Sequence, residues 1–157
     1  MTMVSTTIKQ KLKSLRRLLC HLRTDRIVVL VEGKRDVHAL RGLQFCEGDI
    51  LQISNRRPDD VAQLLSGTKK TVVILTDNDE SGEKLMRRYA EELSANNINV
   101  DTQSRKTIRW IFGVRTMEDL PTAYADFVAT AVMNQLQVGW QPAEAPYTES
   151  VLERMTR

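Results

Sequence analysis

Two short runs of apolar residues restrict the folds open to this chain more than any other feature. The segments 27–31 (IVVLV) and 71–75 (TVVIL) are continuous and rich in β-branched residues, without alternation of polar and apolar positions. Strands of this kind are buried on both faces, which is typical of parallel sheets covered by helices on both sides. The chain is therefore expected to adopt an α/β fold.

Helical patterns alternate with these runs. Apolar residues three and four positions apart predict a helix over 7–22. Helix-compatible stretches follow each of the strands predicted at 27–31, 50–53 and 71–75, and a fourth short strand is predicted at 98–100. Beyond Ser104 the pattern is helical, with one helix ending at Gly113 and another starting at Thr116, before an irregular segment from about residue 136.

This alternation predicts three parts along the chain. Residues 1–25 form a basic amphipathic N-terminal helix, and residues 26–103 form a compact Rossmann-like α/β domain with about four parallel strands flanked by helices. Residues 104–157 form a helical C-terminal extension and tail. A chain of 157 residues is long enough to bury a sizeable core without disulfides or metals as staples.

The composition excludes several classes of protein. With 41% hydrophobic and 27% charged residues, the chain is not expected to be disordered. Two distant cysteines, Cys20 and Cys46, do not suit a disulfide scaffold or a structural zinc site. No apolar run approaches the ~20 residues that cross a bilayer, and the N-terminal segment lacks a signal-peptide pattern. A cytoplasmic location without membrane contact is therefore expected.

Positive charge is concentrated at the start of the chain. Residues 1–26 contain seven Lys or Arg residues and one Asp, although the whole chain carries a net charge of only +3. A basic arm on a mildly acidic body is typical of nucleic-acid binding. The alternative is a docking helix whose basic face is only solvated.

Acidic residues follow two of the predicted buried strands. Glu32 comes directly after the first, and Asp77 and Asp79 follow the third. Ligands of open parallel sheets bind at the carboxyl ends of the strands. If the two strands are neighbours, the three carboxylates meet at one edge, where their oxygens suit Mg²⁺ or Mn²⁺.

Some of these residues also fit other roles. Glu32 alone could cap the helix that follows it. The segment starting at Asp77 resembles half of an EF-hand loop, but its twelfth position is Arg88 and a strand precedes it. The glycines of a dinucleotide site and of a P-loop are absent. His38 is expected to be a surface or partly packed histidine and not a ligand.

The two acidic motifs together resemble those of Toprim (topoisomerase-primase) domains. Glu32-Gly33-Lys34-Arg35-Asp36 matches the E-G-x-x-D motif, and the segment 77–82 (DNDESG) matches D-x-D-x-x-G. The resemblance covers about residues 26–103 and is greatest to short stand-alone Toprim proteins of archaeal type. There is also a likeness to the nucleases that mature 5S ribosomal RNA.

The resemblance assigns roles residue by residue. Glu32 matches the family glutamate that acts as general acid/base or metal ligand, and Asp77 and Asp79 match the pair that binds Mg²⁺. Gly33 and Gly82 match glycines that permit tight turns and close packing, and Asp36 ends the first motif.

Lys34 is at a position that is basic in the nuclease-like branch of the family, where a phosphate contact is one role and a solvated lysine the other. Arg56 and Arg57 follow the second predicted strand at the same sheet edge as the acids, and are expected to contact phosphate. Trp140 and Tyr147 either stack on bases or anchor the C-terminal segment to the core or to a second subunit.

Features missing from the chain narrow the function that the resemblance implies. There is no separate domain for a nucleophilic tyrosine, no zinc-binding module of a primase and no ATPase motif. What is left is a small Mg²⁺-dependent nuclease or phosphotransferase acting on RNA or DNA, in which Mn²⁺ could replace Mg²⁺. The alternative is a non-catalytic nucleic-acid-binding or scaffold protein of DNA repair or RNA processing. Either could need a protein partner or a second copy of the chain.

Overall fold

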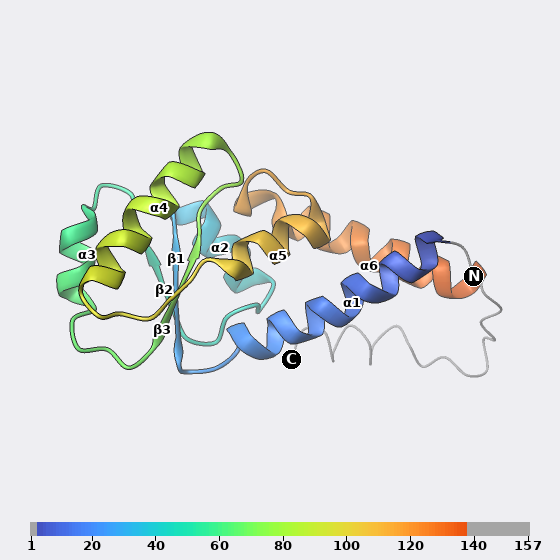
Figure 1. Ribbon diagram of the computed structural model, residues 1–157. Coiled ribbons are helices and arrows are strands. Elements are labelled where there is room, and N and C mark those ends of the chain that lie inside the picture. Colours follow the sequence, from blue (N-terminus) through green and yellow to red (C-terminus); the bar gives the residue numbers. More distant parts are fainter. Residues whose placement is uncertain (1–2, 138–157) are drawn as a thin grey trace.

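The computed structural model describes residues 3–137 and, for side chains, residues 6–134. A four-stranded parallel sheet lies between two layers of helices (Figure 1). The elements in chain order are α1 (Met3–Leu22), β1 (Ile27–Val31), α2 (Lys34–Gly42), β2 (Asp49–Gln52), α3 (Pro58–Leu64), β3 (Thr71–Leu75), α4 (Glu80–Ala95), β4 (Val100–Asp101), α5 (Gln103–Phe112), the 3₁₀ turn η1 (Met117–Asp119) and α6 (Leu120–Gln137). The predicted α/β class and four parallel strands are confirmed.

The strands are arranged in the order β2-β1-β3-β4. β1 therefore lies at the centre and pairs with β2 on one side and β3 on the other. In the β1–β3 pair, Ile27 is opposite Thr71 and Val31 is opposite Leu75. The two buried strands recognised in the sequence are therefore direct neighbours and end at the same level of the sheet.

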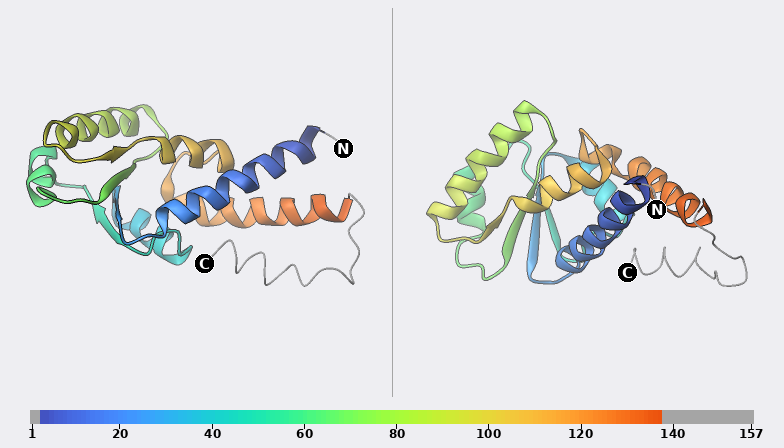
Figure 2. Two further views of the ribbon diagram at one scale, coloured as in Figure 1. Left: turned by 60° about the horizontal axis from the view of Figure 1, so that its bottom comes forward. Right: turned by 45° about the vertical axis from the view of Figure 1, so that its right-hand side comes forward.

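The continuous apolar pattern of β1 arises because each of its faces has a separate hydrophobic core. Ile27, Val29 and Val31 point into one core, which is built with side chains from α1, α2, α5 and α6. Val28 and Leu30 point into the other, which is built with side chains from α3 and α4. The N-terminal helix and the C-terminal extension thus pack into the same core as one face of the sheet. α1 and the C-terminal part of α6 extend past the sheet in the same direction (Figure 2).

Local signals account for most of the element ends. Gly113 ends α5 in the left-handed conformation, with φ of 63°, and Asn97 after α4 is also left-handed, with φ of 59°. Pro58 occupies the first position of α3, where its missing N–H costs no helical hydrogen bond. Among residues 3–137, no helix combines the length and apolar character needed to cross a bilayer.

Two predicted elements differ from the structure at their boundaries. The fourth strand was predicted at 98–100 but covers Val100–Asp101, because Ile98 turns into the core beside α4. The helix predicted from Thr116 begins as η1 and continues as α6 to Gln137. Thr116 Oγ1 lies 2.8 Å from Asp119 Oδ2 at this start. The predicted roles of Trp140 and Tyr147 concern positions outside the described residues.

Two leucines, on helices that cover opposite faces of the sheet, test which side chains belong to the hydrophobic core. Leu40 of α2 is fully buried, whereas Leu64 of α3 is 60% exposed. We expect Leu40→Ala to lower the free energy of unfolding by about 2–5 kcal/mol because it leaves a cavity. Leu64→Ala should change it by no more than ~0.5 kcal/mol. Urea denaturation followed by circular dichroism measures both, and equal losses would contradict the assignment of α2 to the core.

Candidate active site

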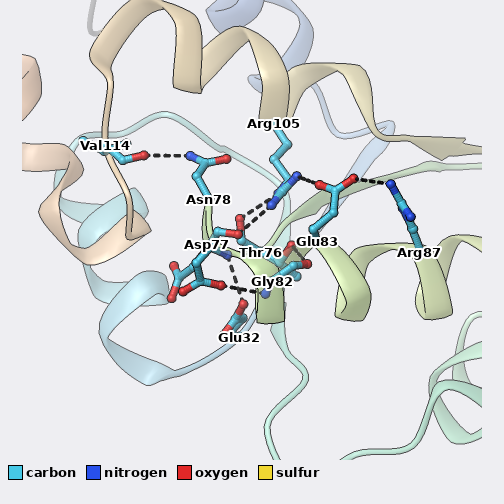
Figure 3. A network of polar contacts seen from close by, with 10 residues as sticks. Glu32, Thr76, Asp77, Asn78, Gly82, Glu83, Arg87, Arg105 and Val114 are labelled. Atoms are coloured by element: carbon cyan, nitrogen blue, oxygen red, sulfur yellow. Dashed lines mark hydrogen bonds and ion pairs between the residues drawn. The ribbon is translucent and has the colours of Figure 1, made fainter.

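The pairing of β1 with β3 brings the two acidic motifs into contact. Glu32 follows β1 directly, and Asp77 follows β3 after Thr76. Glu32 Oε1 accepts a hydrogen bond of 3.0 Å from the backbone N–H of Asp77 (Figure 3). The glutamate is therefore fixed across the sheet edge and does not cap α2, which excludes the helix-cap interpretation of Glu32.

Asp36 takes the role of helix cap at the first motif. Its Oδ2 accepts a 3.0 Å hydrogen bond from the Gly33 N–H, and its carboxylate also accepts one from the Glu118 N–H. The Asp36 side chain is buried, so these two donors are what stabilises it there. Asp36 thus ties the first motif to η1. An added Cβ at Gly33 would make only an ordinary contact with Asp36 Oδ2, at 3.9 Å.

The two aspartates of the second motif are held differently. Asp77 Oδ1 accepts a 3.0 Å hydrogen bond from the N–H of Met117, the first residue of η1. Asp79 is the N-cap of α4, and its Oδ1 accepts a 2.7 Å hydrogen bond from the Gly82 N–H. Asp79 Oδ2 lies 4.0 Å from Nε of Arg115. One oxygen of Asp79 therefore stabilises a helix while the other faces a cation.

Gly82 has a steric reason to be glycine. A Cβ at this position would overlap the carbonyl oxygen of Asp77. The Gly82 carbonyl also accepts a 2.7 Å hydrogen bond from Thr76 Oγ1. The first turn of α4 thus packs directly against the backbone that carries Asp77, as the motif D-x-D-x-x-G requires.

A buried arginine from α5 fixes the end of β3. The Arg105 side chain is only 4% exposed. Its Nε donates to the Thr76 carbonyl at 3.0 Å and its Nη2 to the Asp77 carbonyl at 2.6 Å. Nη1 forms a 2.6 Å ion pair with Glu83 of α4, which also contacts Arg87 (Figure 3). The two arginines lower the pKa of Glu83, chiefly through the hydrogen bond from Arg105. Arg105 therefore donates hydrogen bonds to two backbone carbonyl groups at the point where the chain leaves β3.

The segment between α5 and η1 lies over the acidic edge. Asn78 N–H donates to the Arg115 carbonyl at 2.6 Å, and Asn78 Nδ2 donates to the Val114 carbonyl at 2.8 Å. Arg35 of α2 lies 3.9 Å from Glu118. Sequence reasoning did not identify Arg105, Arg115 or Glu118 as part of the site. Their only signal was a cluster of charges around Gly113, which gives no indication of long-range contacts.

Burial and mutual repulsion raise the pKa values of three carboxyl groups at this edge. For Glu32, Asp36 and Asp77, partial burial is the largest cause. Neighbouring acids raise the pKa further: Asp77, Asp79 and Asp36 act on Glu32, and Asp79 and Glu118 act on Asp77. Hydrogen bonds from backbone N–H groups oppose both effects.

The donor set suits a hard divalent cation, because it consists of carboxylate oxygens whose mutual repulsion a cation would relieve. Within the described part of the chain, however, no three Asp, Glu, His or Cys side chains are already arranged around a common point. Glu32 contacts Asp77 through the backbone N–H of Asp77 and not through its carboxylate, and one oxygen of Asp79 is engaged by Gly82. Glu32, Asp77 and Asp79 Oδ2, which faces Arg115, are the groups that could hold the ion.

Among the described residues, the predicted phosphate-contacting side chains form no ion pair with Glu32, Asp77 or Asp79. Lys34 is the exposed first residue of α2. Arg56 and Arg57 are exposed after β2, and the Arg56 carbonyl accepts a 3.0 Å hydrogen bond from Tyr89. Both arginines line an open hollow of about 750 Å³ between the start of α3 and α4, together with Arg88. Arg57 Nε lies 3.4 Å from Asp59. His38 is exposed, as the sequence predicted.

The fold and the two motifs define an α/β domain that carries acidic residues on the carboxyl ends of two adjacent parallel strands. A family model described as Toprim-like matches residues 29–108. The chain belongs to this Toprim-like family, as the motifs predicted.

Similar proteins come from archaea and from a bacterium. A UPF0292 protein of Pyrococcus furiosus is 38% identical over 106 residues, which are 66% of this chain and 79% of the relative. A UPF0292 protein of Thermococcus sibiricus is 34% identical over 117 residues, or 73% of this chain and 91% of the relative. In a solved structure, a putative protein from Aquifex aeolicus covers 71% of this chain with a TM-score of 0.55 and 28% identity, over 95% of its own length.

The packing of α4 against Asp77 can be tested with a pair of glycines. We expect Gly82→Ala to lower the free energy of unfolding by about 1–3 kcal/mol, because the new methyl group forces α4 or the Asp77 backbone to move. Gly42→Ala, at the end of α2, meets no atom within 4 Å and should be neutral or slightly stabilising. Thermal and urea denaturation measure both. A Gly82→Ala variant as stable as Gly42→Ala would contradict the described contact.

Proposed function

We propose that this protein catalyses Mg²⁺-dependent phosphodiester chemistry on RNA or DNA, as a small nuclease or a phosphotransferase of the Toprim-like family. The single observation that carries the proposal is the contact of the Glu32 carboxylate with the backbone of Asp77. It places the acid of the first motif at the second motif, on an edge where open parallel sheets bind ligands. Family membership supports a metal-dependent, nucleic-acid-related role.

The acidic residues have two kinds of task in this proposal. Asp77 and Asp79 hold the cation, which when bound polarises the phosphate and stabilises the leaving oxygen. Glu32 either completes the metal site or moves the proton of the attacking group. Arg105 keeps the backbone of Asp77 in place, because it binds the carbonyl groups of Thr76 and Asp77 from within the core.

The positive side chains near the edge hold the substrate backbone. Lys34, Arg56 and Arg57 are exposed and extend from the carboxyl side of β1 and β2. Contacts of this type attract phosphates of any sequence and weaken as salt increases. Arg115, beside Asp79, is a further candidate that the sequence did not indicate.

Removal of one metal ligand tests the enzymatic proposal. In Asp77→Asn, the remaining amide oxygen can still accept from Met117, so the fold should be retained. We expect the wild-type protein to cleave a labelled structured RNA or single-stranded DNA with Mg²⁺ or Mn²⁺. The cleavage rate of Asp77→Asn should fall to the rate that the wild type shows with chelator. Asp126→Asn, on the exposed side of α6, is the matched control and should remain active. If the wild type binds nucleic acid but never cleaves it with either metal, the protein is a non-catalytic binding or scaffold member of the family.

The role of Glu32 can be separated from its structural contact. Glu32→Gln keeps an oxygen that accepts from Asp77 N–H but removes the charge. We expect turnover to fall by about 10²–10⁴-fold. The melting temperature at neutral pH should stay the same or rise, because the amide keeps the hydrogen bond and no longer repels the neighbouring acids. If Glu32 moves a proton, the pH–rate profile loses one limb. If it is a ligand, the Mg²⁺ concentration for half-maximal rate rises. Wild-type turnover in this variant would remove Glu32 from the mechanism.

A further inference from the structure

Two basic helices lie side by side on one face of the molecule, α1 and α5 (Figures 1 and 2). Lys11 Nζ lies 5.6 Å from the centre of the Trp110 ring near the end of α5. His21 Nε2 lies 2.8 Å from Oδ2 of Asp101, just before α5 begins. These two contacts show that α1 and α5 run antiparallel, so that the residues between Lys11 and His21 lie along α5.

The charge of this face is predominantly positive. The sequences of α1 and α5 contain no Asp or Glu. Within the described residues, no carboxylate pairs with the exposed Lys13 and Arg17 of α1 or with Lys106 and Arg109 of α5. The acid described at this face, Asp101, is engaged by His21 and by the first residues of α5. A face with such an excess of cations attracts a polyanion.

The opposite layer of helices is different. α4 contains four glutamates, and its Lys84 and Arg87 are paired with Glu80 and Glu83 one turn away. Mixed charges of this kind are typical of a solvated helix surface. Two cations of α4 thus have an acid on their own helix, whereas α1 and α5 offer none to theirs.

Trp110 adds an aromatic surface among these cations. It is 47% exposed, one of three large hydrophobic side chains that are exposed in the described residues. The Lys11 ammonium lies over the ring as a cation–π contact, and the residue keeps its 47% exposure with this contact in place. Cations that track phosphates, next to an aromatic ring on which a base can stack, are the arrangement that binds single-stranded nucleic acid.

We propose that Lys11, Lys13, Arg17, Lys106, Arg109 and Trp110 form a binding surface for single-stranded nucleic acid, called here the α1–α5 surface. The inference rests on the proposed function and adds to it the site of substrate binding and the type of strand. Both ends of α5 are tied to the active edge, because Arg105 in its first turn binds the Asp77 carbonyl and the residues after Gly113 contact Asn78 and Asp77. A strand that lies along α5 therefore stays beside the second acidic motif.

Neutralising two cations of the α1–α5 surface tests its role in binding, under conditions in which chelator prevents cleavage. The probes are fluorescein-labelled oligothymidylate, oligouridylate and a DNA duplex, and binding to full-length protein is followed by anisotropy with chelator present. We expect Lys106→Gln/Arg109→Gln to weaken binding of the single strands and to lower the slope of log K against log salt by about 1.4, or 0.7 for each lost phosphate contact. Lys69→Gln/Lys84→Gln removes the same charge from exposed positions elsewhere and should bind like wild type.

Stacking is tested separately through the indole. Trp110→Ala should weaken single-strand binding at least about fivefold, the lower limit for loss of one stacked base. In a Trp140→Phe background Trp110 is the only tryptophan, and its fluorescence should be quenched by oligothymidylate but much less by the duplex. Circular dichroism melting of each variant verifies that the fold is intact.

Several outcomes would overturn the α1–α5 surface. Equal weakening by the two double variants would mean that only net charge matters. Unchanged Trp110 fluorescence at saturating oligothymidylate, or tighter binding of the duplex, would exclude stacking on a single strand. In each of these cases metal-dependent cleavage by the wild type would still support the proposed function. Failure of the proposed function gives a different result: the single strand binds at the α1–α5 surface but is not cleaved with Mg²⁺ or Mn²⁺.

Discussion

The parallel alignment of β1 with β3 is the constraint on which the rest of the molecule depends. Val31 is opposite Leu75, so β1 and β3 end at the same level of the sheet and Glu32 reaches the backbone of Asp77. A shift of one residue would turn the side chains of β1 towards the other face. It would also exchange the residues that fill the two cores. The packing that stabilises the domain thus also sets the position of its acidic edge.

The sequence was sufficient for the elements whose signals are local. The limits of β1 and β3 are the limits of their apolar runs, and Pro58 and Gly113 mark helix ends by their backbone preferences. The shorter β4 was misplaced by two residues at its start, because a two-residue strand at the sheet edge carries too little pattern to be located. The order of the strands required the family resemblance or the structure, since periodicity says nothing about which strands pair.

The acidic motifs could be found from the sequence, but their surroundings could not. Arg105 is distant in sequence from the carbonyl groups that it binds, and nothing in a helix of sequence QSRKTIRWIF distinguishes the buried cation from the exposed ones. Arg115 and Glu118 reach the edge only because the segment after α5 folds back over Asn78. Tertiary packing decides such contacts. In contrast, Gly82 was recognisable as part of the family motif, and the structure supplies the physical reason, since a side chain there would overlap the Asp77 backbone.

The double engagement of Asp79 has a consequence for how chains of this kind diverge. One of its oxygens begins α4 by accepting from the Gly82 N–H, and Asp77 is held in a similar way by the Met117 N–H. An asparagine keeps either contact, because its amide oxygen accepts a hydrogen bond as a carboxylate oxygen does. What the amide removes is the charge that a cation needs. A sequence with an asparagine at either position and a glycine at position 82 would therefore describe a domain that still folds but no longer holds a metal ion.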